Sequence, residues 1–431
     1  MLSLVGIIVG LGALMFAVMK GLSILVAAPL TMLIVAVSGG LPMLEAYMKH
    51  FMGGAGGYFV PWFPMFFLGA LFGKVMDDVG AAASIAHWIT STLGKSREKA
   101  IIAIVVATAV LTYGGISLFV VVFTTYPLAR ALFRELDIPK RLIGGSIALG
   151  AFTFTMTAIP GTPQIQNIIP TKYFGTDPMA APIVGLIAAA IMAVGGTYYM
   201  ILRARKAAAR GEGFGIEANA RVEEIIKEEA LPNPYLSLVP IILLLVLLNV
   251  FKLNIIVALV GGILAACLIF ISRLRSPIST FNQGAVSSLT AIMNTSCAVG
   301  FGTVVKMVPG FALLVALLGK VSMGNGLIYT AIATNILAGS TGSASGGMSI
   351  ALEAMADKFL ATGANPELLH RITSLASGGL DTLPHNGAVL TLMAACGLTH
   401  KDCYIDIFVV SLLIPVLSTI AAIILGILGI V

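Results

Sequence analysis

Charged residues are scarce in this sequence of 431 residues: they make up 10% of it, while hydrophobic residues make up 58%. An ordinary soluble domain has about 25% charged residues. A chain with so few charges cannot keep its apolar surface inside a soluble globule, and its mean hydropathy of +1.02 agrees with this conclusion. The composition excludes a soluble protein and predicts an integral membrane protein.

Cysteine is also rare. The four cysteines, Cys267, Cys297, Cys396 and Cys403, lie in or beside apolar segments, at spacings that suit neither a metal site nor a disulfide framework. We interpret them as small buried apolar residues. Enzyme motifs are missing too, since the sequence has no His-Glu-x-x-His and no Gly-x-Ser-x-Gly. We therefore expect no metal, no cofactor and no enzymatic activity.

The first 19 residues have no basic region and no small-residue cleavage site, so we expect a retained first membrane span there. The formal net charge is +6. In a soluble protein this charge could indicate a nucleic acid partner, but in a membrane protein Lys and Arg gather on cytoplasmic segments. Most Lys and Arg of this chain lie in segments that we place in the cytoplasm, and we expect no nucleic acid partner.

Apolar runs of about 17 to 25 residues, the length of a membrane-crossing helix, recur along the chain without the alternation of a β-barrel. They predict an all-α polytopic protein of the inner (plasma) membrane, with about ten spans. A Gly-rich connection is expected over 41–58 and a shorter helix over 81–93. The uninterrupted spans are expected at 1–19, 22–40, 59–77, 182–202, 235–251, 254–272 and 279–304.

Two apolar segments have glycine-rich centres. The stretch 101–130 has basic clusters at both ends and Gly114 and Gly115 in its middle, which fits a re-entrant hairpin that enters and leaves through one face of the membrane. The stretch 327–360 is interrupted over 339–349. We expect it to be a second hairpin, entering from the opposite face.

Two further apolar segments are broken by proline. In the segment 141–170, Pro160 and Pro163 remove backbone donors, so several backbone groups lose their helical partners. The segment 368–393 is broken in the same way around Pro384. In hydrocarbon, irregular backbone survives only where it lines a polar cavity or is buried in protein. Both breaks are therefore candidates for a transporter's substrate site.

The two halves of the chain carry matched features in the same order. Phe72-Gly73 corresponds to Phe301-Gly302, the first glycine-rich centre corresponds to the second, and the two proline breaks correspond to each other. With the polar stretch 203–234 as a cytoplasmic linker, the halves 1–202 and 235–431 are expected to form an inverted repeat. Two hairpin tips entering from opposite faces can then meet two broken helices near the midplane, which predicts one central site.

Hydroxyl, amide and backbone groups at the breaks and tips can bind a carboxylate, although each hydroxyl could instead cap a half-helix. The candidate substrate-binding residues are Gly114, Gly115, Ser117, Thr157, Gly161, Thr162, Gln164, Ser343, Ser345, Gly346, Gly347, Thr382, His385 and Asn386. Asp381 and His385 are candidates for the coupling ion, because both are ionisable groups within a membrane segment. The alternatives are a helix cap for Asp381 and a structural or ligand-binding role for His385.

No basic side chain lies at either break, so helix ends, hydroxyls or a bound cation would have to neutralise a substrate carboxylate. Arg371 and Lys172 are expected near the outer mouth of the path. There they could attract anions, or they could serve as interfacial anchors.

These motifs resemble those of the gluconate:proton symporter (GntP-type) permeases of the ion transporter superfamily. The resemblance covers nearly the whole chain and is carried by Phe72-Gly73-Lys74 with Asp77-Asp78, Gly114-Gly115, Pro160-Gly161-Thr162-Pro163 and Pro384-His385-Asn386. It implies a homodimer with a scaffold domain and an elevator-type transport domain. It also implies symport of a small organic acid anion, such as gluconate or 3-hydroxybutyrate, with H⁺ or Na⁺.

Departures from the family pattern narrow this expectation. The first break has no histidine, which favours a short monocarboxylate such as 3-hydroxybutyrate over a sugar acid. The Ser-Asn-Thr triplets of the sodium-dicarboxylate branch are absent from the sequence, which favours H⁺ over Na⁺. Two alternatives stay open: the membrane subunit of a binding-protein-dependent (TRAP-like) transporter, and a sodium-coupled dicarboxylate or citrate carrier.

Overall fold

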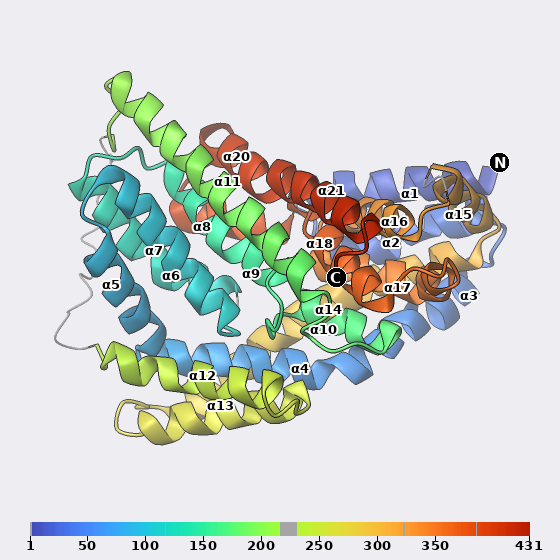
Figure 1. Cartoon of the computed structure of the whole chain (residues 1–431). Coiled ribbons are helices and arrows are strands. Elements are labelled where there is room, and N and C mark those ends of the chain that lie inside the picture. The colour runs from blue at the N-terminus through green and yellow to red at the C-terminus, as the bar shows by residue number, and fades with distance from the viewer. Residues whose placement is uncertain (1, 117, 216–230, 322–323, 385) are drawn as a thin grey trace.

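The structure is a computed structural model that describes residues 2–116, 118–215, 231–321, 324–384 and 386–431 (Figure 1). These residues form helices and connecting turns, without a strand, which confirms the all-α class. Within them, four helical stretches are long and apolar enough to cross a membrane: Met43–Asp78, Pro182–Ala209, Pro277–Met307 and His400–Ile427. Shorter apolar helices of 10–17 residues accompany them.

The first half opens with a helix pair and a long helix. Its elements are α1 (Leu2–Met19), α2 (Ile24–Ser38), α3 (Met43–Glu45), η1 (Ala46–Phe51), α4 (Met52–Asp78), α5 (Ala81–Leu93), α6 (Arg97–Tyr113), α7 (Leu118–Glu135), α8 (Leu142–Phe152), α9 (Phe154–Thr157), α10 (Ile165–Phe174) and α11 (Pro182–Ala209). The helix expected over 81–93 is confirmed by α5. The chain leaves the helical conformation after Thr157, at the first proline break.

The second half repeats the alternation of long and interrupted helices. Its elements are α12 (Pro234–Asn249), α13 (Ile255–Ile269), α14 (Pro277–Met307), α15 (Gly310–Val321), α16 (Gly326–Thr341), α17 (Ala344–Leu360), α18 (Pro366–Ser377), η3 (Leu380–Thr382), α19 (Gly387–Cys396), α20 (His400–Phe408), η4 (Val409–Leu413) and α21 (Ile414–Ile427). The second break lies between α18 and α19.

The Gly-rich connection expected over 41–58 is wrong, because α3, η1 and α4 form one continuous helical stretch there. Glycines in this stretch allow α14 to approach closely. A Cβ on Gly54 would overlap the side chain of Thr303, and a Cβ on Gly300 would lie 2.7 Å from the carbonyl oxygen of Phe51. Close packing of two membrane helices at small residues outweighs the low helix propensity of glycine.

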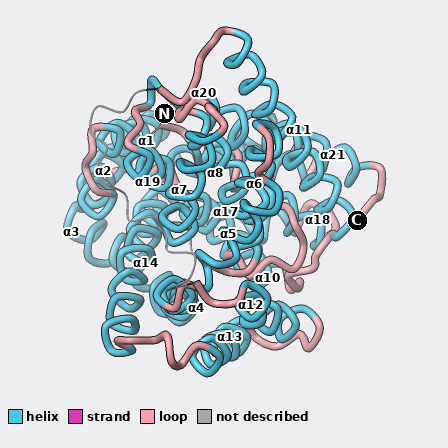
Figure 2. The backbone as a smooth tube through the Cα atoms, turned by 90° about the vertical axis from the view of Figure 1, so that its left-hand side faces the viewer, coloured by secondary structure: helices cyan, strands magenta, loops and turns pink. Residues whose placement is uncertain are grey.

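Two groups of helices pack closely within themselves. The long helices α4 and α14 pack on each other and on α2 and α13. The helices α6, α8, α11 and α20 pack around one another on the other side, and Figure 2 shows α4, α12 and α13 at one edge of the molecule and α11 and α21 at another. Helix α17 of the second hairpin contacts α14 of the first group and also α18, which packs on α10 and α21.

A buried carboxylate ties three elements of the second group together. The side chain of Asp406 on α20 is fully buried, and its Oδ1 accepts hydrogen bonds from Arg203 Nε at 2.6 Å and from the Tyr199 hydroxyl at 3.0 Å. Arg141 Nη1 lies 3.3 Å from its Oδ2. Arg141 also bonds Glu212, and this hydrogen bond lowers the pKa of Glu212. A buried charge persists only when paired in this way.

We predict that Gly347→Ala destabilises the protein. Gly347 faces α16 within the hairpin, where a Cβ would overlap the Cα of Ala338. Backbone cannot yield as a flexible side chain does, so we expect a loss of about 1–3 kcal/mol or more from overpacking. Thermal unfolding in detergent measures this loss. The matched control is Gly12→Ala on α1, where a Cβ has nothing within 4 Å; equal unfolding temperatures for the two variants would contradict the prediction.

Candidate functional site

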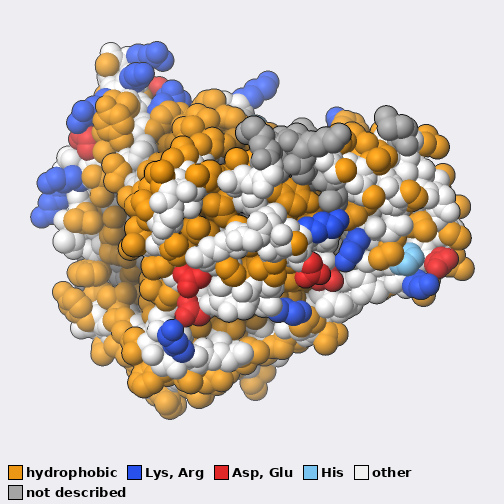
Figure 3. Space-filling view, turned by 45° about the vertical axis from the view of Figure 1, so that its right-hand side comes forward, with side chains coloured by type: hydrophobic (Ala, Val, Ile, Leu, Met, Phe, Trp, Pro, Cys, Tyr) orange, Lys and Arg blue, Asp and Glu red, His pale blue; other side chains and the backbone are white. Residues whose placement is uncertain are grey.

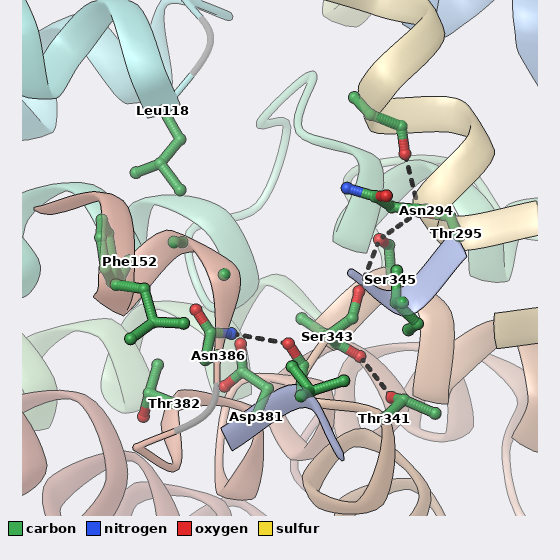
Figure 4. Close-up of a pocket in the computed structure, with 18 of the residues that line it drawn as sticks. Leu118, Phe152, Asn294, Thr295, Thr341, Ser343, Ser345, Asp381, Thr382 and Asn386 are labelled. Atoms are coloured by element: carbon green, nitrogen blue, oxygen red, sulfur yellow. Dashed lines mark hydrogen bonds between the residues drawn. The ribbon is translucent and has the colours of Figure 1, made fainter. Parts of the chain in front are cut away.

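A cavity of about 390 Å³ lies where the second hairpin, the second break and α14 meet (Figure 4). Phe66, Leu118, Phe152 and Met156 contribute apolar walls. Its described lining contains no lysine, arginine or histidine. The polar lining consists of Ser23, Thr157, Gln166, Asn294, Thr295, Thr341, Ser343, Ser345, Asp381, Thr382 and Asn386.

Two helix N-termini open into this cavity. Helix α17 begins after Ser343, whose hydroxyl oxygen accepts from the N–H of Gly346 at 3.2 Å. Helix α19 begins after Asn386, whose Oδ1 accepts from the N–H of Val389 at 2.9 Å. These caps leave the first two N–H groups of each helix without an intrahelical acceptor. Unpaired N–H groups and the positive ends of two helix dipoles favour an anion.

Asp381 brings a carboxylate to the same cavity. It lies in η3, between the helices of the second break, and is 8% exposed. Its Oδ1 has no hydrogen-bond partner in the described part of the chain, and the same holds for Oε1 of Gln166, which also lines the cavity. A buried acceptor without a partner costs about 1–3 kcal/mol. Both oxygens are therefore available to a proton, a cation or a ligand donor.

Side chains from three elements hold the second break in shape. Asn335 of α16 accepts from the N–H of Leu380 at 3.1 Å, and the Tyr404 hydroxyl donates to the carbonyl oxygen of Thr382 at 3.1 Å. Asn386 Nδ2 donates to the carbonyl oxygen of Gly342 at 3.0 Å, which links the break to the hairpin tip. In Figure 4, Asp381, Thr382 and Asn386 face Ser343, Ser345 and Thr295 across the cavity.

The first break is held by side chains in the same manner, but its backbone is closed off from the cavity. Three successive carbonyl oxygens, of residues 160–162, accept from Tyr113 Oη at 3.1 Å, Asn249 Nδ2 at 2.9 Å and Asn167 Nδ2 at 3.0 Å. Gln164 Nε2 donates to the carbonyl oxygen of Thr112 at 2.5 Å. These bonds satisfy the irregular backbone from within the protein.

The predicted site residues thus fall into separate places. Gly346 and Gly347 pack against α14 and α16, and Ser117 and His385 lie outside the described residues. The cavity is lined by Thr157, Ser343, Ser345, Asp381, Thr382 and Asn386. The tip of the first hairpin meets the first break, where Gly115 packs on Pro163 and Gln164 bonds the Thr112 carbonyl oxygen. Gly114 faces Ile241 of α12, Gly161 faces Asn249 and Met179, and the Thr162 hydroxyl oxygen accepts from the N–H of Gln164.

Sequence reasoning missed five polar residues of the cavity: Ser23, Gln166, Asn294, Thr295 and Thr341. Ser23 caps α2, and the other four lie within regular helices. Glycine and proline do not mark Asn294 and Thr295, whereas Thr341 lies within the glycine-rich interruption 339–349. The one signal that could have found Asn294 and Thr295 is a pair of adjacent polar residues in the middle of an apolar span.

Arg371 is fully buried, so the expectation that it attracts anions or serves as an interfacial anchor is wrong. Its guanidinium donates to the carbonyl oxygen of Ala180, at 2.7 Å from Nη2, and to Asn167 Oδ1, at 2.9 Å from Nη1. Neighbouring His370 reaches the same Asn167 oxygen from Nε2, at 3.2 Å. Because Asn167 also bonds the first break, Arg371 connects α18 of the second broken helix to the first one.

Interrupted apolar helices around a polar cavity are typical of membrane transporters. Comparison with known families matches residues 2–280 to the GntP family permease. The chain is 42% identical to a Bacillus subtilis (strain 168) protein described as "Uncharacterized transporter YxjC", over 96% of each chain. It is 26% identical to an "Uncharacterized permease" of Haemophilus influenzae, over 57% of this chain and 50% of the relative. The chain belongs to the GntP permease family, which confirms the resemblance seen in its motifs.

We predict that Arg371→Met destabilises the protein by about 3 kcal/mol or more, because the buried oxygens of Ala180 and Asn167 lose their donors. Loss of the monodisperse peak on heating in detergent measures the effect. Lys252→Met is the control: this exposed lysine pairs with Asp177 on the surface, and we expect a change of about 0.5 kcal/mol or less. An Arg371→Met variant as stable as its control would show that the hydrogen bonds from Arg371 to Ala180 and Asn167 are not needed for stability.

Proposed function

We propose that this permease is a cation-coupled symporter that imports a small organic acid anion, such as 3-hydroxybutyrate or gluconate, by alternating access. The observation that supports the proposal is the pairing, in one cavity, of two helix N-termini with the unpartnered carboxylate of Asp381. A volume of about 390 Å³ lies within the usual range of small-molecule sites, roughly 300–1,000 Å³.

The substrate carboxylate lies at the N-termini of α17 and α19 in this proposal. The free N–H groups of the first turns bind its oxygens. Asn294 and Thr295 on α14 lie across the cavity (Figure 4) and bind the hydroxyl group of the substrate. Such hydrogen bonds to an acid with a nearby hydroxyl distinguish it from a plain fatty acid, which would leave these polar groups unpaired.

Coupling follows from charge. An ionised Asp381 beside a substrate anion places two negative charges in a cavity whose described lining has no basic side chain, and such repulsion is strong where water is excluded. A proton on Asp381, or a bound cation, removes the repulsion. Binding of the cation therefore raises the affinity for the anion, and the reverse holds by linkage. We propose H⁺ as the coupling ion, with His385 as a further candidate group.

The moving parts in this proposal are the hairpins and the broken helices. Residues 1–202 and 235–431 form the inverted repeat, 203–234 the cytoplasmic linker, and two copies of the chain a dimer. Both halves contain a helical hairpin followed by an interrupted helix, in the same order, which supports the repeat. The long helices α4 and α14 suit a scaffold, and the second hairpin, which contacts α14 through α17, suits an elevator-type transport domain.

The test is uptake of labelled 3-hydroxybutyrate and gluconate into proteoliposomes, driven by a proton gradient or a sodium gradient in separate runs. We predict that protons drive uptake. Asp381→Asn should lower concentrative uptake by about 5- to 150-fold, the range that typical coupling free energies give. Substrate exchange without a gradient should survive, since asparagine resembles the protonated acid.

The matched control is Asp357→Asn, an exposed carboxylate on α17, for which uptake should be unchanged. Uptake that follows sodium and is unaffected by Asp381→Asn would refute H⁺ coupling at this residue. Absence of uptake of both acids under both gradients would refute the substrate class.

A further inference from the structure

A second cavity, of about 370 Å³, shares no lining residue with the first. Its lining comes from η1, α4, α10, α14 and α17, and it contains the basic side chains that the first cavity lacks. Figure 3 shows Lys and Arg side chains beside a histidine and acidic side chains on the face that includes this end of the molecule. The polar and aromatic lining residues are Lys49, His50, Tyr58, Trp62, Lys172, Tyr173, Thr303, Lys306, Ser349 and Glu353.

The two cavities lie one after the other along helices α14 and α17, which line both of them. On α17, Ser345 lines the first cavity, whereas Ser349 and Glu353 line the second. On α14, Thr295 lines the first cavity and Val299 the second. Steps of four residues on one helix are about one turn, or roughly 5.4 Å. The nearest lining residues of the two cavities are therefore about one helical turn apart on both helices.

The second cavity is positively charged. Among the described residues, neither Lys172 nor Lys306 pairs with a carboxylate: Lys172 lies over the ring of Tyr173, 5.8 Å from its centroid, and Lys306 Nζ donates to the backbone carbonyl of Glu353 at 3.0 Å. Lys49 carries the third ammonium group, which lies 3.1 Å from Oε1 of Glu45, four residues earlier in the same helical stretch. Two ammonium groups thus face one carboxylate, that of Glu353.

A buried hydroxyl group also points to a ligand. Tyr58 on α4 is 4% exposed and lines the second cavity, and its Oη has no hydrogen-bond partner within the described chain. The carboxylate of Glu353 is occupied, since its Oε2 accepts from the Tyr173 hydroxyl at 3.0 Å. An unpaired buried hydroxyl beside two ammonium groups suits an oxygen-bearing anion, which accepts from all three.

We propose that this cavity is an outer capture site for small carboxylate anions, separate from the transport cavity. The inference rests on the proposed function for its direction, because Lys172 is expected near the outer mouth of the path. Lysines around a recess raise the local concentration of an anion and so its rate of association. The acid then moves from the capture site along α14 and α17 to the first cavity, which binds it for transport.

Trp62 provides a direct test, since it lines the second cavity and the sequence contains only one other tryptophan, Trp88. In a Trp88→Phe background, iodide quenching of Trp62 fluorescence reports anions in the cavity, and acrylamide quenching reports access of an uncharged molecule. We expect 3-hydroxybutyrate to protect Trp62 from iodide, and its uncharged methyl ester to give no protection.

The variant Lys172→Gln/Lys306→Gln should weaken iodide quenching in the same background and leave acrylamide quenching unchanged. Lys358→Gln is the control, a lysine of α17 outside the cavity that lies over the Phe311 ring. Equal losses of iodide and acrylamide quenching in the double variant, or no protection by 3-hydroxybutyrate in the parent, would overturn the capture site.

Transport kinetics give the second readout. At low ionic strength the double variant should raise KM for 3-hydroxybutyrate about 5- to 10-fold with kcat unchanged, and the difference should shrink as salt screens the charges. An unchanged KM, or a fall in kcat at every salt concentration, would overturn the proposal. If the parent protein shows no cation-driven uptake, the symport proposal fails, while Trp62 quenching still decides whether the capture site exists.

Discussion

Every peptide group inside a membrane must find a hydrogen-bond partner within the protein, and the two proline breaks of this permease are arranged around that requirement. At the breaks, side chains provide the hydrogen-bond partners that the backbone groups would have in a continuous helix. Tyr113, Asn249 and Asn167 donate to three successive carbonyl oxygens of the first break, and Asn335 accepts at the second. These bonds fix where α6, α12 and α16 lie against the broken helices. The position of the cavity follows from them.

Much of the fold could be predicted from the sequence, because the hydrocarbon core imposes helix lengths and makes proline breaks conspicuous. Helix α5 lies where the sequence indicates, and the chain leaves the helical conformation after Thr157 and Ser377, inside the two segments that contain the proline breaks. The continuous helix through 43–78 could not be predicted, since it depends on Gly54 packing against α14. The burial of Arg371 could not be predicted either, because its partners, Asn167 and Ala180, are far away in sequence.

The site could be predicted only in part, for a related reason. Residues at tips and breaks, such as Ser343 and Asn386, stand out by their neighbours in the sequence. Which break faces a cavity depends instead on tertiary hydrogen bonds: the first break is closed by side chains, and the second leaves Asp381 Oδ1 without a partner among the described residues.

The two cavities also differ in how they attract an anion. Helix ends in the first are fixed partial charges, whereas lysines in the second are mobile full charges.

The bonds that close the first break have a consequence for biosynthesis. The donor to the carbonyl oxygen of Gly161 is Asn249, 88 residues later in the chain. Asn167, which donates to the carbonyl oxygen of Thr162, is itself bonded by Arg371, 204 residues later. While the ribosome is still making the second half, the first half lacks these partners. The nascent chain therefore needs water, lipid headgroups or the insertion machinery at these carbonyls, and the first break reaches its final form only after α18 has been inserted.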